Sequence, residues 1–161
     1  MRKQKGFSLI ELLIVVAIIL IIAAIAIPNL LRSRISANEA SAVASIRAIS
    51  TAEISYATTY PQLGFADSLE KLGPGNAGKP TPEAANLIDP ALARGEKSGY
   101  RFTLTPSRSS KEGANNGFTI VAEPTAPGQT GIRTFCSNQS SILYYQADGG
   151  ACVPGTSPVL E

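Results

Sequence analysis

The chain has 161 residues, enough for one modest domain beyond a hydrophobic N-terminal segment. Its formal charge of +2 depends on three of its fourteen Lys and Arg residues, which lie within the first five positions; without them eleven basic residues face twelve acidic ones and the charge is −1. No basic patch typical of nucleic-acid-binding proteins stands out. The lack of histidine excludes His-based acid–base catalysis and argues against a zinc enzyme, so we expect neither metal nor cofactor.

The N-terminal segment is the most informative part of the sequence. Sixteen uninterrupted apolar residues, Leu12 to Ile27, follow a basic stretch and a single carboxylate, Glu11. The segment from Phe7 to Leu31 would form a helix of roughly 37 Å, longer than the roughly 30 Å hydrocarbon core of a membrane. A carboxylate in such a segment is unfavourable and by default indicates a functional site.

Composition alone leaves three interpretations of this segment open. It could be a secretory signal peptide, since Ala24-Ile25-Ala26 imitates a cleavage site, although the run is longer than usual and Glu11 interrupts its start. It could be a permanent anchor for an unrelated domain. It could also span the membrane first and later pack against copies of itself, which best explains Glu11.

The stretch Gly6-Phe7-Ser8-Leu9-Ile10-Glu11, with the apolar run that ends at Pro28, resembles the N-terminus of type IV prepilins. The resemblance implies that a prepilin peptidase cleaves after Gly6, removing a leader of residues 1–6, and that the new N-terminal Phe7 is N-methylated. It also implies that Glu11 meets the N-terminal amine of a neighbouring subunit during filament growth.

Elementary chemistry fits these roles. Gly6 has no side chain, so a protease can approach the backbone closely, and the basic leader favours the cytoplasmic side of the membrane. An α-amino group titrates near ~8 and a carboxylate near ~4, so the Phe7 amine and Glu11 are both charged at neutral pH. In apolar surroundings, pairing with an amine relieves the penalty on the carboxylate.

The helix is expected to continue through Pro28, which would kink it, and to run from Ser8 to Thr58, since Pro61 follows. Residues 7–31 are expected to cross the membrane and later form the filament core. Residues 32–60 are expected to form an amphipathic half that covers the protein's own head, because from Leu31 onward apolar residues recur at helical spacing: Leu31, Ile35, Ala42, Ile46, Ile49 and Tyr56.

Two acidic residues, Glu39 and Glu53, lie on or beside this periodic face. We expect them either to be solvated at its margin or to form salt bridges between subunits. Because exposed pairs are weak, neither residue is expected to decide assembly alone.

Residues 61–161 are expected to form the globular head. In the loop 61–99, Asp67 is predicted to cap a short turn closed by Gly73, and Asp89 to cap another that begins with Pro90. Alternating patterns between residues 100 and 146 predict four antiparallel strands in a meander, with a turn at Asn116-Gly117. The strands are placed at 100–105, 118–123, 132–136 and 142–146.

These elements predict an α+β fold in which the long N-terminal helix packs on a small four-stranded antiparallel sheet, the lollipop shape of type IV pilins. Two cysteines in an exported chain most economically form one disulfide, Cys136–Cys152, whereas nothing nearby supports two reactive thiols. The resulting loop, 136–152, resembles the disulfide-bonded loop of many pilins.

Three classes of function follow from these expectations. The first is the structural subunit of an extracellular type IV pilus, held in the inner membrane by a single span before it joins a helical filament of identical subunits. Its expected partners are the prepilin peptidase and methylase and an inner-membrane assembly platform. The second is a pseudopilin of a type II secretion system, or a minor pilin. The third, a membrane-anchored enzyme or binding module, is disfavoured by the missing histidine.

Overall fold

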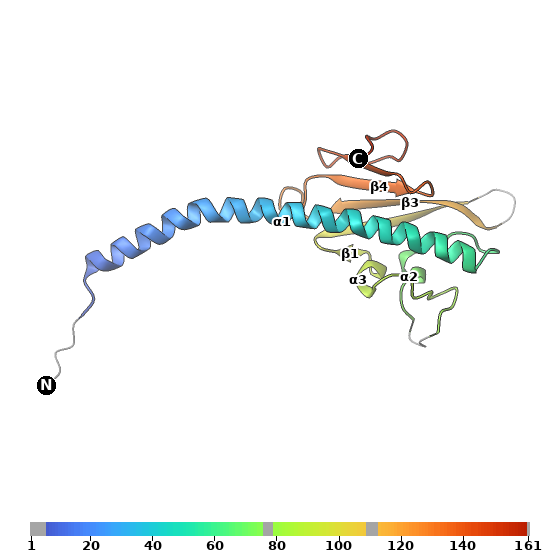
Figure 1. Ribbon diagram of the computed structural model, residues 1–161, viewed down its shortest axis with the longest axis horizontal. Helices are drawn as coiled ribbons and strands as arrows, with labels where there is room; N and C mark the ends of the chain where they lie inside the picture. Colours follow the sequence, from blue (N-terminus) through green and yellow to red (C-terminus); the bar gives the residue numbers. More distant parts are fainter. Residues whose placement is uncertain (1–5, 76–78, 109–112, 161) are drawn as a thin grey trace. The chain divides into compact units, whose positions relative to one another are not determined.

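The computed structural model describes residues 6–75, 79–108 and 113–160, so all of the expected leader except Gly6 lies outside the described residues. The elements are α1 (Leu9–Thr59), α2 (Leu69–Leu72), α3 (Pro90–Ala93), β1 (Glu96–Lys97), β2 (Tyr100–Arg108), β3 (Asn115–Pro124), β4 (Thr134–Asn138) and β5 (Leu143–Gln146) (Figure 1). The chain divides into two compact units, one ending at Arg34 and the other beginning at Ile35, and α1 contributes to both.

Helix α1 is 51 residues long and agrees with the predicted bounds to within one residue at each end. It is continuous through Pro28, as predicted. Because proline has no N–H group, one carbonyl of the preceding turn lacks its helical hydrogen-bond partner. The helix ends at Thr59, two residues before Pro61, and the N–H of Tyr60 closes the last turn on the carbonyl of Tyr56.

The five strands form one antiparallel sheet in chain order, β1-β2-β3-β4-β5. The predicted α+β fold and meander are therefore confirmed, but the predicted count of four strands is wrong. The additional strand, β1, has only two residues, too few for an alternating pattern to reveal it.

The predicted turn at Asn116-Gly117 is also wrong. Both residues lie within β3, where Gly117 is paired with Ser107 of β2. Strand β2 ends at Arg108 and β3 begins at Asn115, and residues 109–112 between them lie outside the described residues.

The core of the second unit lies between one face of the sheet and α1 (Figure 1). From α1 it takes buried residues three or four positions apart, which is the spacing of one helix face: Ala42, Ile46, Ile49, Ala52 and Tyr56. From the sheet it takes Tyr100, Phe102, Phe118, Ile120, Ala122, Phe135 and Leu143. Full burial of one large apolar side chain contributes about 1.5–3 kcal/mol, so this face holds the helix on the sheet.

The segment after α1 is fastened to the start of β3. The N–H of Phe65 donates to the carbonyl of Asn115 (3.0 Å), and the N–H of Asn115 donates to the carbonyl of Leu63 (3.0 Å). Gly64, between them, has φ +72°, and a Cβ there would collide with the Asn115 carbonyl oxygen. Only glycine fits this close approach of two backbones.

The two short helices test the predicted caps. Asp89 accepts hydrogen bonds from the N–H groups of Ala91 and Leu92, so its predicted cap on α3 is confirmed. The cap predicted for Asp67 is wrong: the N-cap of α2 is Ser68, which makes no side-chain cap bond, and Asp67 instead pairs with the ammonium group of Lys71 at 2.9 Å.

The expected disulfide between Cys136 and Cys152 is present. Cys136 lies on β4, and both cysteines are buried with Tyr144 of β5. The C-terminal segment also pairs with β5, where the N–H of Leu160 donates to the carbonyl of Leu143 (2.8 Å). A cross-link over a loop of this length contributes about 3 kcal/mol in the loop-entropy model.

Candidate functional site

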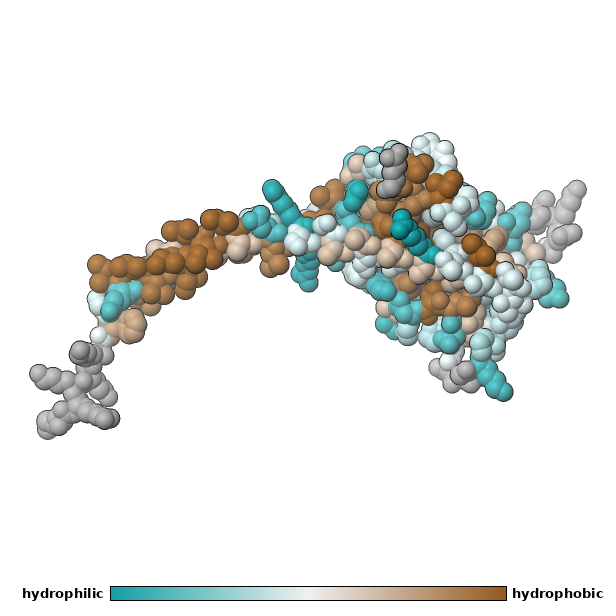
Figure 2. Space-filling view, viewed as in Figure 1, coloured by the Kyte–Doolittle hydropathy of each residue, from teal (hydrophilic) through white to brown (hydrophobic). Residues whose placement is uncertain are grey.

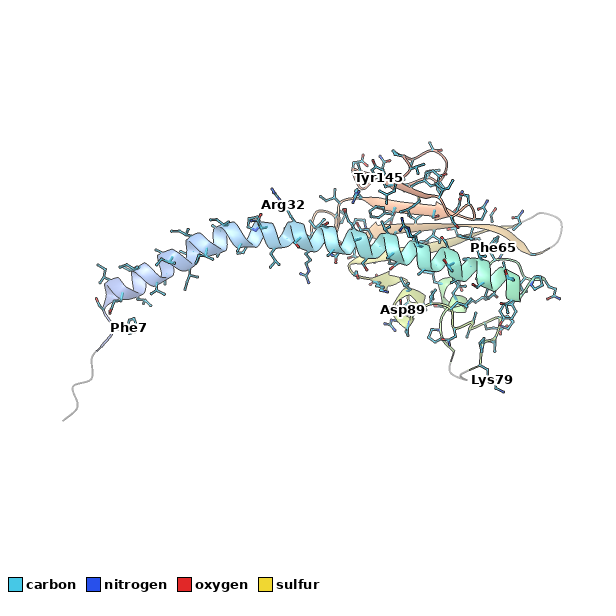
Figure 3. All side chains as sticks on the ribbon, in the orientation of Figure 1. Phe7, Arg32, Phe65, Lys79, Asp89 and Tyr145 are labelled. Atoms are coloured by element: carbon cyan, nitrogen blue, oxygen red, sulfur yellow. A yellow bond between two sulfur atoms is a disulfide. The ribbon has the colours of Figure 1, made fainter. Side chains whose placement is uncertain are left out.

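The expected cleavage site lies before the first turn of α1. Gly6 and Phe7 precede the helix, and the Phe7 side chain, labelled in Figure 3, is 84% exposed. No described atom outside its neighbours lies within 4 Å of the position that a Cβ on Gly6 would take. An accessible backbone outside the helix, at a residue without a side chain, suits the active-site cleft of a peptidase.

Glu11 lies in the first turn of the same helix. The N–H of Ser8 donates to Glu11 Oε2 at 2.9 Å, so the carboxylate folds back toward the start of the chain. A carboxylate in this position satisfies a free N–H group and lies at the positive end of the helix dipole. The structure therefore brings Gly6, Phe7 and Glu11 together at one helix end, with Glu11 directed toward the backbone that would carry the new amine.

The first unit exposes a continuous apolar surface. Its large hydrophobic side chains range from 41% exposed at Leu31 to 84% at Phe7, and Figure 2 shows this part of α1 as an almost uniform brown surface. Helix α1 is long and apolar enough to cross a membrane. Pro28, the predicted kink, lies within this surface and is itself exposed. A surface of this extent requires lipid or another protein to cover it.

Glu39 joins the second half of α1 to the loop before β4. Its Oε1 accepts from the N–H groups of Ile132 (3.0 Å) and Arg133 (3.1 Å), and its Oε2 accepts from the Arg133 guanidinium at 2.8 Å. Burial raises the pKa of Glu39, but these bonds outweigh it and hold the pKa below its usual value. The Arg133 guanidinium also lies 5.3 Å from the ring centre of Phe135.

Glu53 is completely buried on the face of α1 that meets the loop before α2. Its Oε2 accepts from the N–H of Ala66 at 2.8 Å, and its Oε1 has no hydrogen-bond partner among the described residues. Burial, reinforced by the nearby charge of Asp67 and opposed by the Ala66 bond, raises the pKa of Glu53 to about 7.

Both expectations for these residues were therefore wrong, since Glu39 and Glu53 are neither solvated nor available for salt bridges to another subunit. Their position in the sequence could have predicted their burial: Glu53 lies between Ile49 and Tyr56 on the periodic face, which packs against the head. Cys136, Cys152 and both glutamates belong to the second unit, whereas Gly6, Phe7, Glu11 and Pro28 belong to the first.

The N-terminal segment matches a known family motif. Residues 1–27 match the family model described as the Prokaryotic N-terminal methylation motif. The match covers Gly6, Phe7 and Glu11, and it confirms the resemblance of this segment to the N-terminus of type IV prepilins.

The chain is also similar to two components of type IV pili. The chain is 67% identical over 39 residues to the type IV wide pilus major component PilA4 of Thermus thermophilus, covering 24% of this chain and 30% of that protein. It is 34% identical over 101 residues to the type IV major pilin protein PilA of Myxococcus xanthus, covering 63% of this chain and 38% of that protein.

A third relative comes from a secretion system. The chain is 44% identical over 52 residues to the type II secretion system core protein G of Vibrio cholerae, covering 32% of this chain and 36% of that protein. The chain thus spans less than two fifths of the length of each of these relatives. No solved structure matches it significantly.

Proposed function

We propose that this chain is the structural subunit of an extracellular type IV pilus. In this proposal residues 1–6 are the leader, 7–31 the membrane span and later the filament core, 32–60 the amphipathic half of the helix and 61–161 the head. The precursor waits in the inner membrane with a single span. After processing, identical subunits join a helical filament at an inner-membrane assembly platform. No enzymatic role is assigned to the chain.

The residues at the start of α1 have separate tasks. A prepilin peptidase cuts between Gly6 and Phe7, and the methylase modifies the freed amine of Phe7. Glu11 of an incoming subunit then pairs with the amine of a subunit already in the filament. Pro28 bends the helix so that its apolar half can pack against other copies.

One observation carries the proposal: the apolar half of α1 is exposed on every side and carries a single carboxylate, next to the processing site. Lipid covers such a surface before assembly, and the apolar helices of other subunits cover it afterwards. A buried carboxylate that has lost water needs a cationic partner, and the Phe7 amine of a neighbour supplies one.

The test is electron microscopy of filaments sheared from the cell surface, combined with mass spectrometry of their subunits. Long filaments that contain this chain as the main component support the proposal. Its absence from such filaments, in cells that make the protein, would contradict it.

The second candidate is a pseudopilin of a type II secretion system, favoured by the similarity to core protein G of Vibrio cholerae over 52 residues. The same processed N-terminus would then occur without surface filaments, and deletion of the gene would stop secretion of the system's substrates. A minor pilin would instead appear in filaments as a small fraction of the subunits.

A further inference from the structure

A cavity of about 290 Å³ lies between α1 and the β4–β5 hairpin. Ile46 of α1 and Leu143 of β5 form buried apolar walls, and Arg47, Ser50 and Ser137 contribute polar groups. Ligand cavities in proteins generally exceed about 300 Å³, so this one suits a side chain better than a cofactor.

Two of the lining groups lack a partner. The Ser50 hydroxyl is buried and makes no hydrogen bond within the described part of the chain, although buried hydroxyls are nearly always paired. Arg47 is exposed and forms no ion pair with any described residue. The lining contains no carboxylate. The cavity therefore offers the positive charge of Arg47 and the Ser50 hydroxyl, beside the apolar side chains of Ile46 and Leu143. The Ser137 hydroxyl already donates to the carbonyl of Ile142 at 2.8 Å.

We propose that this cavity binds a carboxylate side chain from a neighbouring copy of the chain, an inference that rests on the proposed pilus function. The Arg47 guanidinium matches a carboxylate through two parallel N–H bonds. The methylene stem of an acidic side chain lies against Ile46 and Leu143, and the Ser50 hydroxyl donates to an oxygen that reaches the base of the cavity.

The carboxylates of the second unit that have no described partner within the chain are the candidates for binding in this cavity. Among its described carboxylates, Glu70 and Glu83 are exposed and accept no ion pair or hydrogen bond. Glu123 faces Arg101 across β2 and β3. The remaining carboxylates are engaged within the chain: Asp67 with Lys71, Asp89 with Lys97, Glu96 with Arg101, Glu39 with Arg133, Glu53 with the Ala66 N–H and Asp148 with the Gly150 N–H.

The cavity and these two carboxylates lie on different flanks of the second unit. In Figure 1 the β4 strand and helix α2 lie on opposite sides of α1. Figure 3 shows the same separation between Tyr145, on β5, and Lys79, which lies in the chain between Glu70 and Glu83. Complementary patches on two flanks produce head-to-tail contacts, and contacts of this type generate open helical filaments.

The test uses the full chain in cells that assemble it. Arg47→Glu places a carboxylate against a carboxylate, so we expect the yield of sheared filaments to fall about tenfold or more, as for the loss of one close charge pair. Glu70→Arg or Glu83→Arg should produce the same loss. Arg94→Glu, an equal change of charge at the exposed end of α3, should leave the yield unchanged.

Combining the two charge reversals in one chain provides the decisive comparison. Because every subunit carries both patches, Arg47→Glu with either Glu70→Arg or Glu83→Arg should recover most of the filaments. Immunoblots of the membrane fraction separate loss of assembly from loss of folding. If Arg47→Glu does not accumulate, Arg47→Gln keeps the stem of the side chain and should still lower the yield.

Full filament yield from Arg47→Glu, or failure of both double variants to recover it, would overturn this inference and leave the proposed function standing. An absence of filaments from the unaltered chain would instead remove the proposed function itself.

Discussion

The two halves of α1 place similar apolar residues in different surroundings. In the first unit, the side chains from Leu9 to Leu31 are largely exposed, whereas Ala42, Ile46 and Ile49 in the second are completely buried. The second half buries only one face, because its remaining positions are mainly small or polar. The difference shows that the chain supplies a core for one half of the helix and leaves the other to be covered by lipid or by another protein.

The carboxylates of the two halves differ in the same way. Glu39 and Glu53 are enclosed by their own head, while Glu11 is exposed and, among the described residues, accepts one hydrogen bond, from the Ser8 N–H. Changes at Glu11 should therefore affect assembly, and changes at Glu39 or Glu53 should affect the stability of the head.

The largest expected effect is at Glu11. Glu11→Gln can still accept the Ser8 N–H and keep the first turn of the helix, but it cannot form an ion pair with an amine. We expect both Glu11→Gln and Glu11→Ala to abolish incorporation into filaments, measured as pilin in the sheared fraction, while the membrane pool stays normal. Normal piliation of Glu11→Gln would show that local capping, and not the charge, is its role.

At Glu39 we expect a change in stability. Glu39→Ala leaves two backbone N–H groups and the partly exposed Arg133 without their acceptor, which should lower the free energy of unfolding by about 1–3 kcal/mol. Urea unfolding of the full chain in detergent, followed by tyrosine fluorescence, measures the loss. Glu70→Ala, at an exposed position, is the matched control and should change stability by less than about 0.5 kcal/mol. Equal effects of the two variants would contradict the role of Glu39.

Glu53 should make the head less stable as pH rises. The unfolded carboxyl releases its proton near pH 4.5 and the folded one near pH 7, so deprotonation of the unfolded chain favours unfolding between these values. The free energy of unfolding should fall by about 3 kcal/mol across this window and stay constant above it. Glu53→Gln should remove the fall.

The lowered pKa of Glu39 has the opposite effect on stability. Its contribution is present above its unfolded pKa of 4.5 and is lost as pH falls through the lower folded pKa, so acid below pH 4.5 should destabilise the head. For the Glu53 prediction above, a free energy of unfolding that does not change between pH 4.5 and pH 7 in the unaltered chain would contradict the burial of that carboxyl group.

The smallest effect is expected at Asp89. Asp89→Ala removes the cap on α3 and the pair with Lys97, which should lower the free energy of unfolding by about 1 kcal/mol. Asp67→Ala, which removes a pair but no cap, should have a smaller effect in the same measurement. A larger loss from Asp67→Ala would contradict the assignment of a cap to Asp89 and of none to Asp67.

Local sequence patterns predicted the parts of the molecule that local physics determines. The periods of 3.6 and 2 located α1 and the longer strands, and Asp89-Pro90 located one cap. The errors arise where distant residues decide the outcome. Asn116-Gly117 forms no turn because β2 pairs with β3 on both sides of it, and Glu53 is buried because the Ala66 N–H, thirteen residues away, reaches its carboxylate.

The candidate site shows the same division. The sequence predicted Gly6, Phe7 and Glu11, which form one contiguous motif. It did not reveal the cavity at Arg47, because that cavity requires α1 and the β4–β5 hairpin, about ninety residues apart in the chain, to lie side by side. No pattern confined to either segment carries this information.

The mass of the N-terminal peptide of subunits taken from surface filaments tests the central claim most directly. We expect a peptide that begins at Phe7 and carries one methyl group on its amine. A peptide that retains residues 1–6, or one that begins at Ile27 after a cut behind Ala24-Ile25-Ala26, would contradict it.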